Sequence, residues 1–89
     1  MKTVAIPLTN VEVGKRIGVD PSTASYFRHG RRLPSMTTLM AIFKAFDVSP
    51  EEQEKITKAI NKKGDRQSRL NAFGKWMRET IYTRPSIDV

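Results

Sequence analysis

The sequence has no cysteine, a single histidine and no long apolar run. Without cysteine, disulfide frameworks and thiolate metal sites are excluded. A lone His29, with no second histidine and no clustered carboxylate pair, does not supply a metal site or acid–base chemistry. We therefore expect no metal, no cofactor, no small-molecule substrate and no enzymatic activity. No segment reaches membrane-spanning length and no signal peptide is visible, so we expect a cytoplasmic protein and no membrane partner.

Negative charge is also scarce, and positive charge outweighs it. Among 89 residues there are 16 Lys and Arg against 9 Asp and Glu, a formal net charge of +7. Hydrophobic residues make up 38% and charged residues 28%, which is typical of one globular domain with a modest core. The positive excess favours nucleic acid as a partner; the alternative is a protein that is merely basic and soluble.

Helix-start signals divide the chain into short segments. Ser, Thr or Asp before a helix accepts from free backbone amides, Pro fits the first helical position, and Glu three residues after the cap completes a capping box. Such signals occur at Thr9 with Glu12, Asp20 with Pro21, Ser35, Ser49 with Pro50 and Glu52, and Asp65. Gly18, Gly30 and Gly64 mark helix ends. The pattern predicts an all-α fold, a compact bundle of about five short helices, with a short extended segment at residues 2–6.

The last predicted helix, residues 66–82, is unusually apolar. Its sequence places Leu70, Phe73, Met77 and Ile81 on one face, with Trp76 beside it. Either this face completes the core, or it forms a dimer interface through Leu70, Phe73, Trp76 and Met77, because aromatic residues and Met are enriched at interfaces. Both interpretations stay open, and they are compatible.

Two of the predicted helices, joined by the tight turn at residues 18–20, have the geometry of a helix-turn-helix. In the second helix Ala24 and Phe27 are three residues apart and are expected to face inward. The outward residues near its start are then Pro21, Ser22, Ser25 and Tyr26. Hydroxyl groups can bond base edges in the major groove, and a proline can contact a thymine methyl group. We predict these four residues as base contacts.

A set of ordered marks extends over about half the chain. They are Leu8-Thr9, Gly14, Ile17-Gly18-Val19, Ser22-Thr23, Ser25, Phe27, Gly30-Arg31-Arg32, Pro34-Ser35, Leu39 and Phe46-Asp47-Val48-Ser49. In this order they make residues 8–52 similar to the helix-turn-helix of the phage Cro and CI repressors and their bacterial relatives, the Xre family.

The resemblance implies a sequence-specific transcriptional regulator that binds double-stranded operator DNA, usually as a homodimer. A phage- or plasmid-encoded repressor acting in a bacterial host cell fits it best. By position, Ser22, Ser25 and Tyr26 fall where the family reads bases. Residues expected to contact phosphates are Asn10, Thr23, Arg31 and Arg32 from the resemblance, with Arg28 and His29 added from their place at the helix end.

Two departures from the family pattern carry predictions. The family usually has a full helix before this pair, whereas only residues 1–7 precede Leu8. We expect the C-terminal helix or the segment at residues 3–6 to substitute for it. The domain organisation is then a helix-turn-helix domain at residues 1–64 and a C-terminal helix with a frayed tail at residues 65–89. The second departure is Pro21, where many members carry a polar base-reading side chain.

Other functions remain open at this point. An antitoxin-like or accessory protein-interaction module that also binds DNA would use the apolar face around Trp76. A recombination-directing accessory factor is a further DNA-binding alternative.

Overall fold

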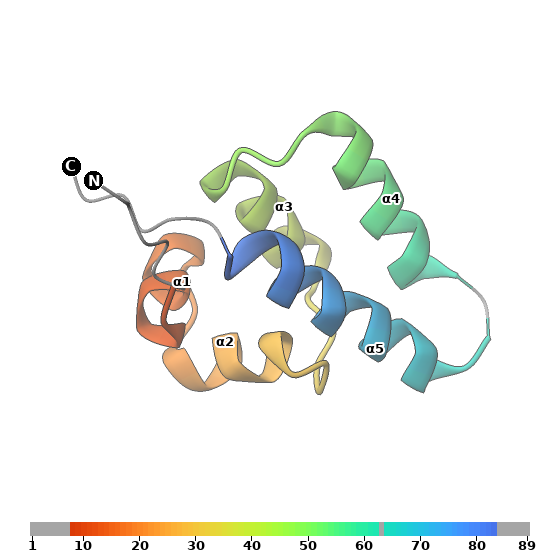
Figure 1. Ribbon diagram of the computed structural model, residues 1–89, viewed down its shortest axis with the longest axis horizontal. Helices are drawn as coiled ribbons and strands as arrows, with labels where there is room; N and C mark the ends of the chain where they lie inside the picture. The colour runs from red at the N-terminus through yellow and green to blue at the C-terminus, as the bar shows by residue number, and fades with distance from the viewer. Residues whose placement is uncertain (1–7, 63, 84–89) are drawn as a thin grey trace, which may run out of the picture.

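The computed structural model describes residues 8–62 and 64–83, which form helices joined by short connections (Figure 1). The helices are α1 Asn10–Ile17, α2 Pro21–Arg28, α3 Met36–Ala45, α4 Pro50–Asn61 and α5 Arg66–Trp76, and α5 continues into a π-helical segment, η1 Met77–Ile81. The predicted all-α bundle is confirmed, and no strand occurs in the described ranges. The predicted extended segment at residues 2–6 lies outside them, as does the tail after Thr83.

Each predicted start signal forms an N-cap. At α1 the Thr9 hydroxyl accepts from the Glu12 amide at 3.2 Å, and the Glu12 carboxylate accepts from the Thr9 amide at 3.3 Å, which completes the predicted capping box. The other caps are Asp20, Ser35, Ser49 and Asp65. The capping box predicted at Ser49 is only half formed, because the Glu52 carboxylate accepts from the Trp76 indole nitrogen at 3.2 Å.

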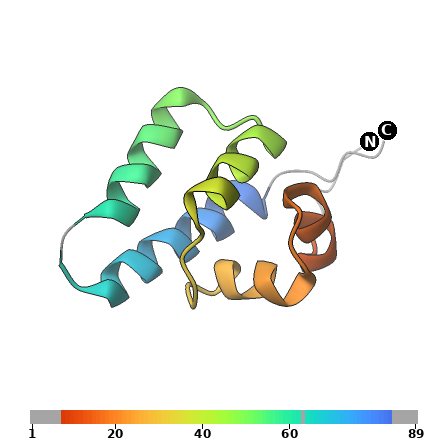
Figure 2. The same cartoon turned by 180° about the vertical axis from the view of Figure 1, so that it is seen from behind.

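The C-terminal helix crosses the molecule and contacts helices on both sides of it. In the two opposite views α5 and η1 run through the middle, with α2 on one side and α4 on the other (Figures 1 and 2). Phe73 packs edge-to-face on Phe27 of α2 at 5.7 Å between ring centroids, and Trp76 packs on Phe43 of α3 at 6.2 Å. These rings join α2, α3 and α5 in one core.

The apolar residues predicted on the last helix are buried within the chain. Leu70, Phe73, Trp76 and Met77 are each less than a tenth exposed. A dimer interface made by these four side chains stays a prediction, and the chain itself already covers each of them. The predicted helix over residues 66–82 differs in its last part, because the backbone from Met77 onward winds as a π-helix.

Two backbones touch where α5 meets the end of α2. A Cβ atom on Gly74 would lie 2.6 Å from the Gly30 amide nitrogen, and one on Gly30 would lie 2.7 Å from the Leu70 carbonyl oxygen. Only residues without a Cβ atom permit this approach. The C-terminal helix is therefore seated directly on the end of α2, the helix with the predicted base contacts.

Candidate nucleic-acid interface

The α2 helix has one buried side and one open side. Ala24 and Phe27 are 0% and 2% exposed and point into the core. On the opposite side Pro21, Ser22 and Tyr26 are exposed and Ser25 is half-buried. The inward and outward sides are those that the sequence predicts, while the base contacts themselves stay a prediction.

One predicted phosphate contact lies beside the predicted base contacts. Asn10, the first residue of α1, lines a shallow open hollow together with Pro21, Ser22, Ser25 and Tyr26. The N-terminus of a helix carries partial positive charge and free amide groups, which suit a phosphate. The hollow thus joins the start of α1 to the open side of α2.

The start of α2 is held by its cap. The Thr23 amide donates to the Asp20 carboxylate at 3.0 Å, and Pro21 occupies the first turn. Hydrogen bonds from Thr23 lower the pKa of the Asp20 carboxyl, and the positive charge of Arg32 lowers it slightly further. The side chain of Thr23 is half-buried beside this cap. The carboxylate therefore stays ionised as an acceptor for the helix amide.

The turn between α1 and α2 is closely packed. A Cβ atom on Gly14 would lie 2.6 Å from the Val19 carbonyl oxygen. The backbone of α1 thus lies against the turn, and a larger residue at position 14 would push the two helices apart. This contact fixes how α2 projects from α1.

A basic loop follows α2, and part of it is bonded to the helix. The Arg32 guanidinium lies over the Tyr26 ring at 5.0 Å from its centroid, while Arg31 is exposed and none of the residues in the described ranges pairs with its side chain. An arginine stacked on a ring keeps its N–H edge free to donate. Both arginines can therefore donate to phosphate oxygens beside the open side of α2.

The last residues of α2 contact the C-terminal segment. The Arg28 guanidinium lies 4.7 Å from the centroid of the Tyr82 ring. The backbone carbonyl oxygen of Arg28 accepts from Arg78 Nη1 at 2.8 Å. His29 follows as the C-cap residue and its side chain is exposed. Arg28 is thus stacked on the C-terminal segment, whereas Arg32 is stacked on α2 itself.

A family model described as helix-turn-helix matches residues 8–53. The match covers half of the chain and spans α1, the turn, α2, α3 and the start of α4. The chain belongs to the helix-turn-helix family of the Xre, Cro and CI type. It is accordingly a DNA-binding regulator of the Xre type, and the suspected resemblance is confirmed. No curated protein and no solved structure gave a significant match.

Two residues outside the matched helix-turn-helix support it, and the sequence did not single them out. One is Arg78, described above. The other is Tyr82, whose one hydroxyl hydrogen is shared between two acceptors: Asn10 Oδ1, 2.8 Å from the hydroxyl oxygen, and the Ala24 carbonyl oxygen, 3.2 Å from it. Burial raises the pKa of Tyr82 to about 12, although the charge of Arg28 acts in the opposite direction. Tyr82 is therefore a neutral donor, and no local sequence signal links it to residues 58 and 72 positions away.

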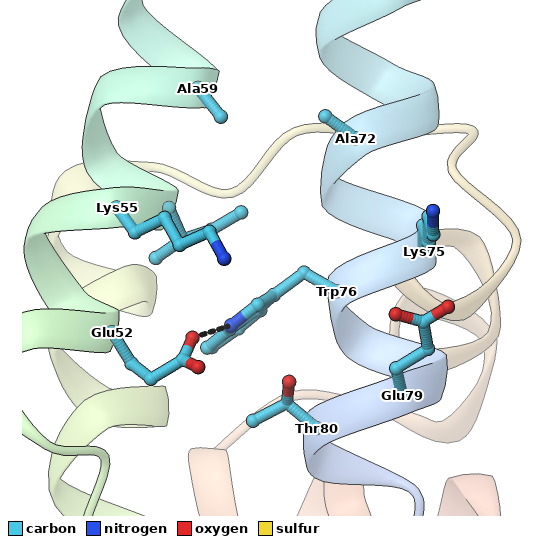
Figure 3. A pocket seen from close by; sticks show the side chains of 9 residues that line it. Glu52, Lys55, Ala59, Ala72, Lys75, Trp76, Glu79 and Thr80 are labelled. Atoms are coloured by element: carbon cyan, nitrogen blue, oxygen red, sulfur yellow. Dashed lines mark hydrogen bonds between the residues drawn. The ribbon is translucent and has the colours of Figure 1, made fainter.

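A second hollow lies on the other side of α5, between α4 and α5 (Figure 3). Glu52, Lys55, Lys75 and Glu79 line this hollow together with Trp76, whose indole N–H donates to Glu52. Charges of both signs lie close together there, so this hollow lacks the positive bias of the α2 side. Within residues 8–62 and 64–83 no group of three or more His, Cys, Asp or Glu side chains is placed to hold a metal ion. No helix in these ranges is long and apolar enough to span a membrane.

Proposed function

We propose that this helix-turn-helix protein is a sequence-specific repressor of the phage Cro and CI type. It inserts α2 into the major groove of operator DNA in the cytoplasm of a bacterial host cell. The observation that carries the proposal is the open side of α2, where Ser22, Ser25 and Tyr26 line one hollow. Tyr26 also contacts the loop with the exposed Arg31 and Arg32. Hydroxyl groups on a groove-reading helix select bases, and arginines beside it bind the phosphates.

The roles divide by chemistry. Ser22, Ser25 and Tyr26 bond base edges, and Pro21 makes only apolar contact, for which a thymine methyl group is suitable. The phosphate contacts come from the two helix starts and from the end of α2: Asn10, Thr23, Arg28, His29, Arg31 and Arg32. Tyr26 stacks under Arg32, which couples one base contact to one phosphate contact.

We infer that the protein binds DNA as a homodimer. Two exposed methionines, Met36 at 58% and Met40 at 55%, line a groove between α3 and α4 together with Phe43 and Pro50. A second copy packed there would remove these methionines from water, which favours association. Two-fold symmetry would place the half-sites about 10 base pairs apart. Sedimentation of Met40→Lys should show weaker self-association than Val11→Lys, a control at another exposed apolar residue on α1.

Selection of bound duplexes from a random pool tests the function. We expect one enriched motif with two inverted half-sites. The double variant Arg31→Ala, Arg32→Ala should weaken binding to all duplexes. The slope of the logarithm of the binding constant against the logarithm of the salt concentration should fall by roughly two, because two phosphate contacts are lost. Ser25→Ala should instead change which base is preferred, at a cost of about 1–3 kcal/mol for the original site. A pool without enrichment, or arginine variants that bind like the wild type, would refute the docking described above.

A further inference from the structure

The contact between Tyr82 and the start of α1 joins two parts of the proposed DNA surface to the C-terminal segment. The one hydroxyl hydrogen is shared between Asn10 Oδ1 of α1, the nearer acceptor at 2.8 Å, and the Ala24 carbonyl oxygen of α2 at 3.2 Å. Tyr82 is 2% exposed and lies beyond the residues that match the family model. The buried Tyr82 hydroxyl therefore links α1 to α2, the helix with the predicted base contacts.

The bond also decides which end of the Asn10 amide faces outward. An asparagine amide has one accepting oxygen and one nitrogen with two donors. Oδ1 accepts from Tyr82, and within the described ranges Nδ2 donates to no residue. Asn10 also lines the hollow beside Ser22 and Ser25, so its side chain borders the side of α2 that reads bases. The free donor is therefore the atom available to a phosphate oxygen.

We propose that Tyr82 is a positioning residue for DNA binding: its hydroxyl fixes the Asn10 side chain with the Nδ2 donors toward a backbone phosphate. The inference rests on the proposed DNA-binding function and deepens it. Tyr82 itself does not touch DNA. It acts through Asn10 alone.

Tyr82→Phe is the variant that isolates this role. It removes the hydroxyl and keeps the ring that fills the core and lies under Arg28. The matched control is Thr83→Val, which removes a hydroxyl bonded at 2.7 Å to the Glu79 carbonyl, one residue further along and on an exposed side chain. Circular dichroism at the assay temperature establishes that each variant is folded.

The binding assay is an anisotropy titration of a labelled duplex of about 20 base pairs, long enough for two half-sites one helical turn apart. One duplex carries the selected sequence and a second carries a scrambled one. Tyr82→Phe should bind both about three- to tenfold more weakly than the wild type, because an oriented hydrogen bond to phosphate is lost. Asn10→Ala should lose a similar factor, and the double variant should be no weaker than Asn10→Ala alone. Thr83→Val should bind like the wild type.

A purely structural role for the hydroxyl gives a different result. In that case the losses of Tyr82→Phe and Asn10→Ala multiply in the double variant. Nuclear magnetic resonance of the wild type adds a readout that needs no variant to fold: the side-chain amide signals of Asn10 should shift when the duplex is added. Unchanged Asn10 signals, or multiplied losses, or equal binding of Tyr82→Phe and wild type, overturn the positioning role. If the wild type binds neither duplex, the DNA-binding proposal itself fails, and the positioning role fails with it.

Discussion

The two helices of the helix-turn-helix, α1 and α2, are each followed by a glycine of the same conformation in different surroundings. Gly18 ends α1 and Gly30 follows α2, and both have left-handed backbone angles, with φ of 77° and 66°. Around Gly18 a Cβ atom would meet nothing within 4 Å, whereas at Gly30 it would lie 2.7 Å from the Leu70 carbonyl oxygen. The first glycine is required only by its own turn. The second is also required by a helix that lies forty residues later in the chain.

This difference shows that α2 depends on contacts from outside the matched helix-turn-helix. At its start α2 is fixed by its neighbours in sequence, through Asp20 and Gly14. At its end it is fixed by Gly74, Arg78 and Tyr82 of the C-terminal segment. We therefore expect changes in the C-terminal helix to affect α2 directly.

Replacement of the two glycines should give the largest effect. Gly30→Ala combines a left-handed alanine with a clash against backbone, so we expect a loss of about 3 kcal/mol in the free energy of unfolding. Gly18→Ala introduces the left-handed alanine alone and should cost about 1 kcal/mol. The reduced freedom of the unfolded chain is common to both variants and cancels. Urea denaturation measures the difference, and equal losses would show that α5 does not press on Gly30.

Alkaline pH should weaken the Tyr82 contact. The folded-state pKa of Tyr82 is about 12, above the ordinary 10.0, because burial disfavours the phenolate. The stability that the neutral Tyr82 hydroxyl contributes to the folded state is therefore complete below pH 10 and is lost as the pH rises toward 12. Over this interval the wild type should lose on the order of 2 kcal/mol more unfolding free energy than Tyr82→Phe, which lacks this hydroxyl and is otherwise identical. Parallel pH profiles for the two proteins would contradict a buried Tyr82 hydroxyl.

A smaller effect is expected at the end of α2. Arg78→Met removes the donor to the Arg28 carbonyl, a bond of 2.8 Å, and keeps most of the side-chain stem. We expect a loss of about 1 kcal/mol, together with faster amide exchange in the last turn of α2. Lys75→Met is the control, since it makes the same charge change at an exposed residue of α5. Its effect should be below about 0.5 kcal/mol, and similar losses in both variants would assign the effect to charge alone.

Much of the fold can be predicted from the sequence because its signals are local. A capping side chain and the amide it accepts from are two or three residues apart. The sequence therefore predicts helix starts that the structure contains, at Thr9, Asp20, Ser35 and Ser49. The three-residue spacing of Ala24 and Phe27 likewise gives the buried side of α2 and, by exclusion, its open side.

What could not be predicted depends on pairs that are far apart in the sequence. Glu52 has the spacing of a capping box, but a tryptophan 24 residues later takes its carboxylate. Tyr82 meets Asn10 across 72 residues, and Arg78 meets Arg28 across 50. Helical periodicity places such side chains on a face but does not name the partner, because the partner is set by how the helices pack. The contacts that position the candidate site, those of Tyr82 and Arg78, can therefore be found only from the folded structure.

The most direct measurement of the central claim is a nuclear magnetic resonance titration of the full chain with the selected duplex. We predict that the amide signals of Ser22, Ser25 and Tyr26, with those of Arg31 and Arg32, shift most. Signals around Met36 and Met40 should change little when the free and the DNA-bound protein are in the same oligomeric state. Shifts confined to the α3–α4 groove, with the open side of α2 unchanged, would contradict the account.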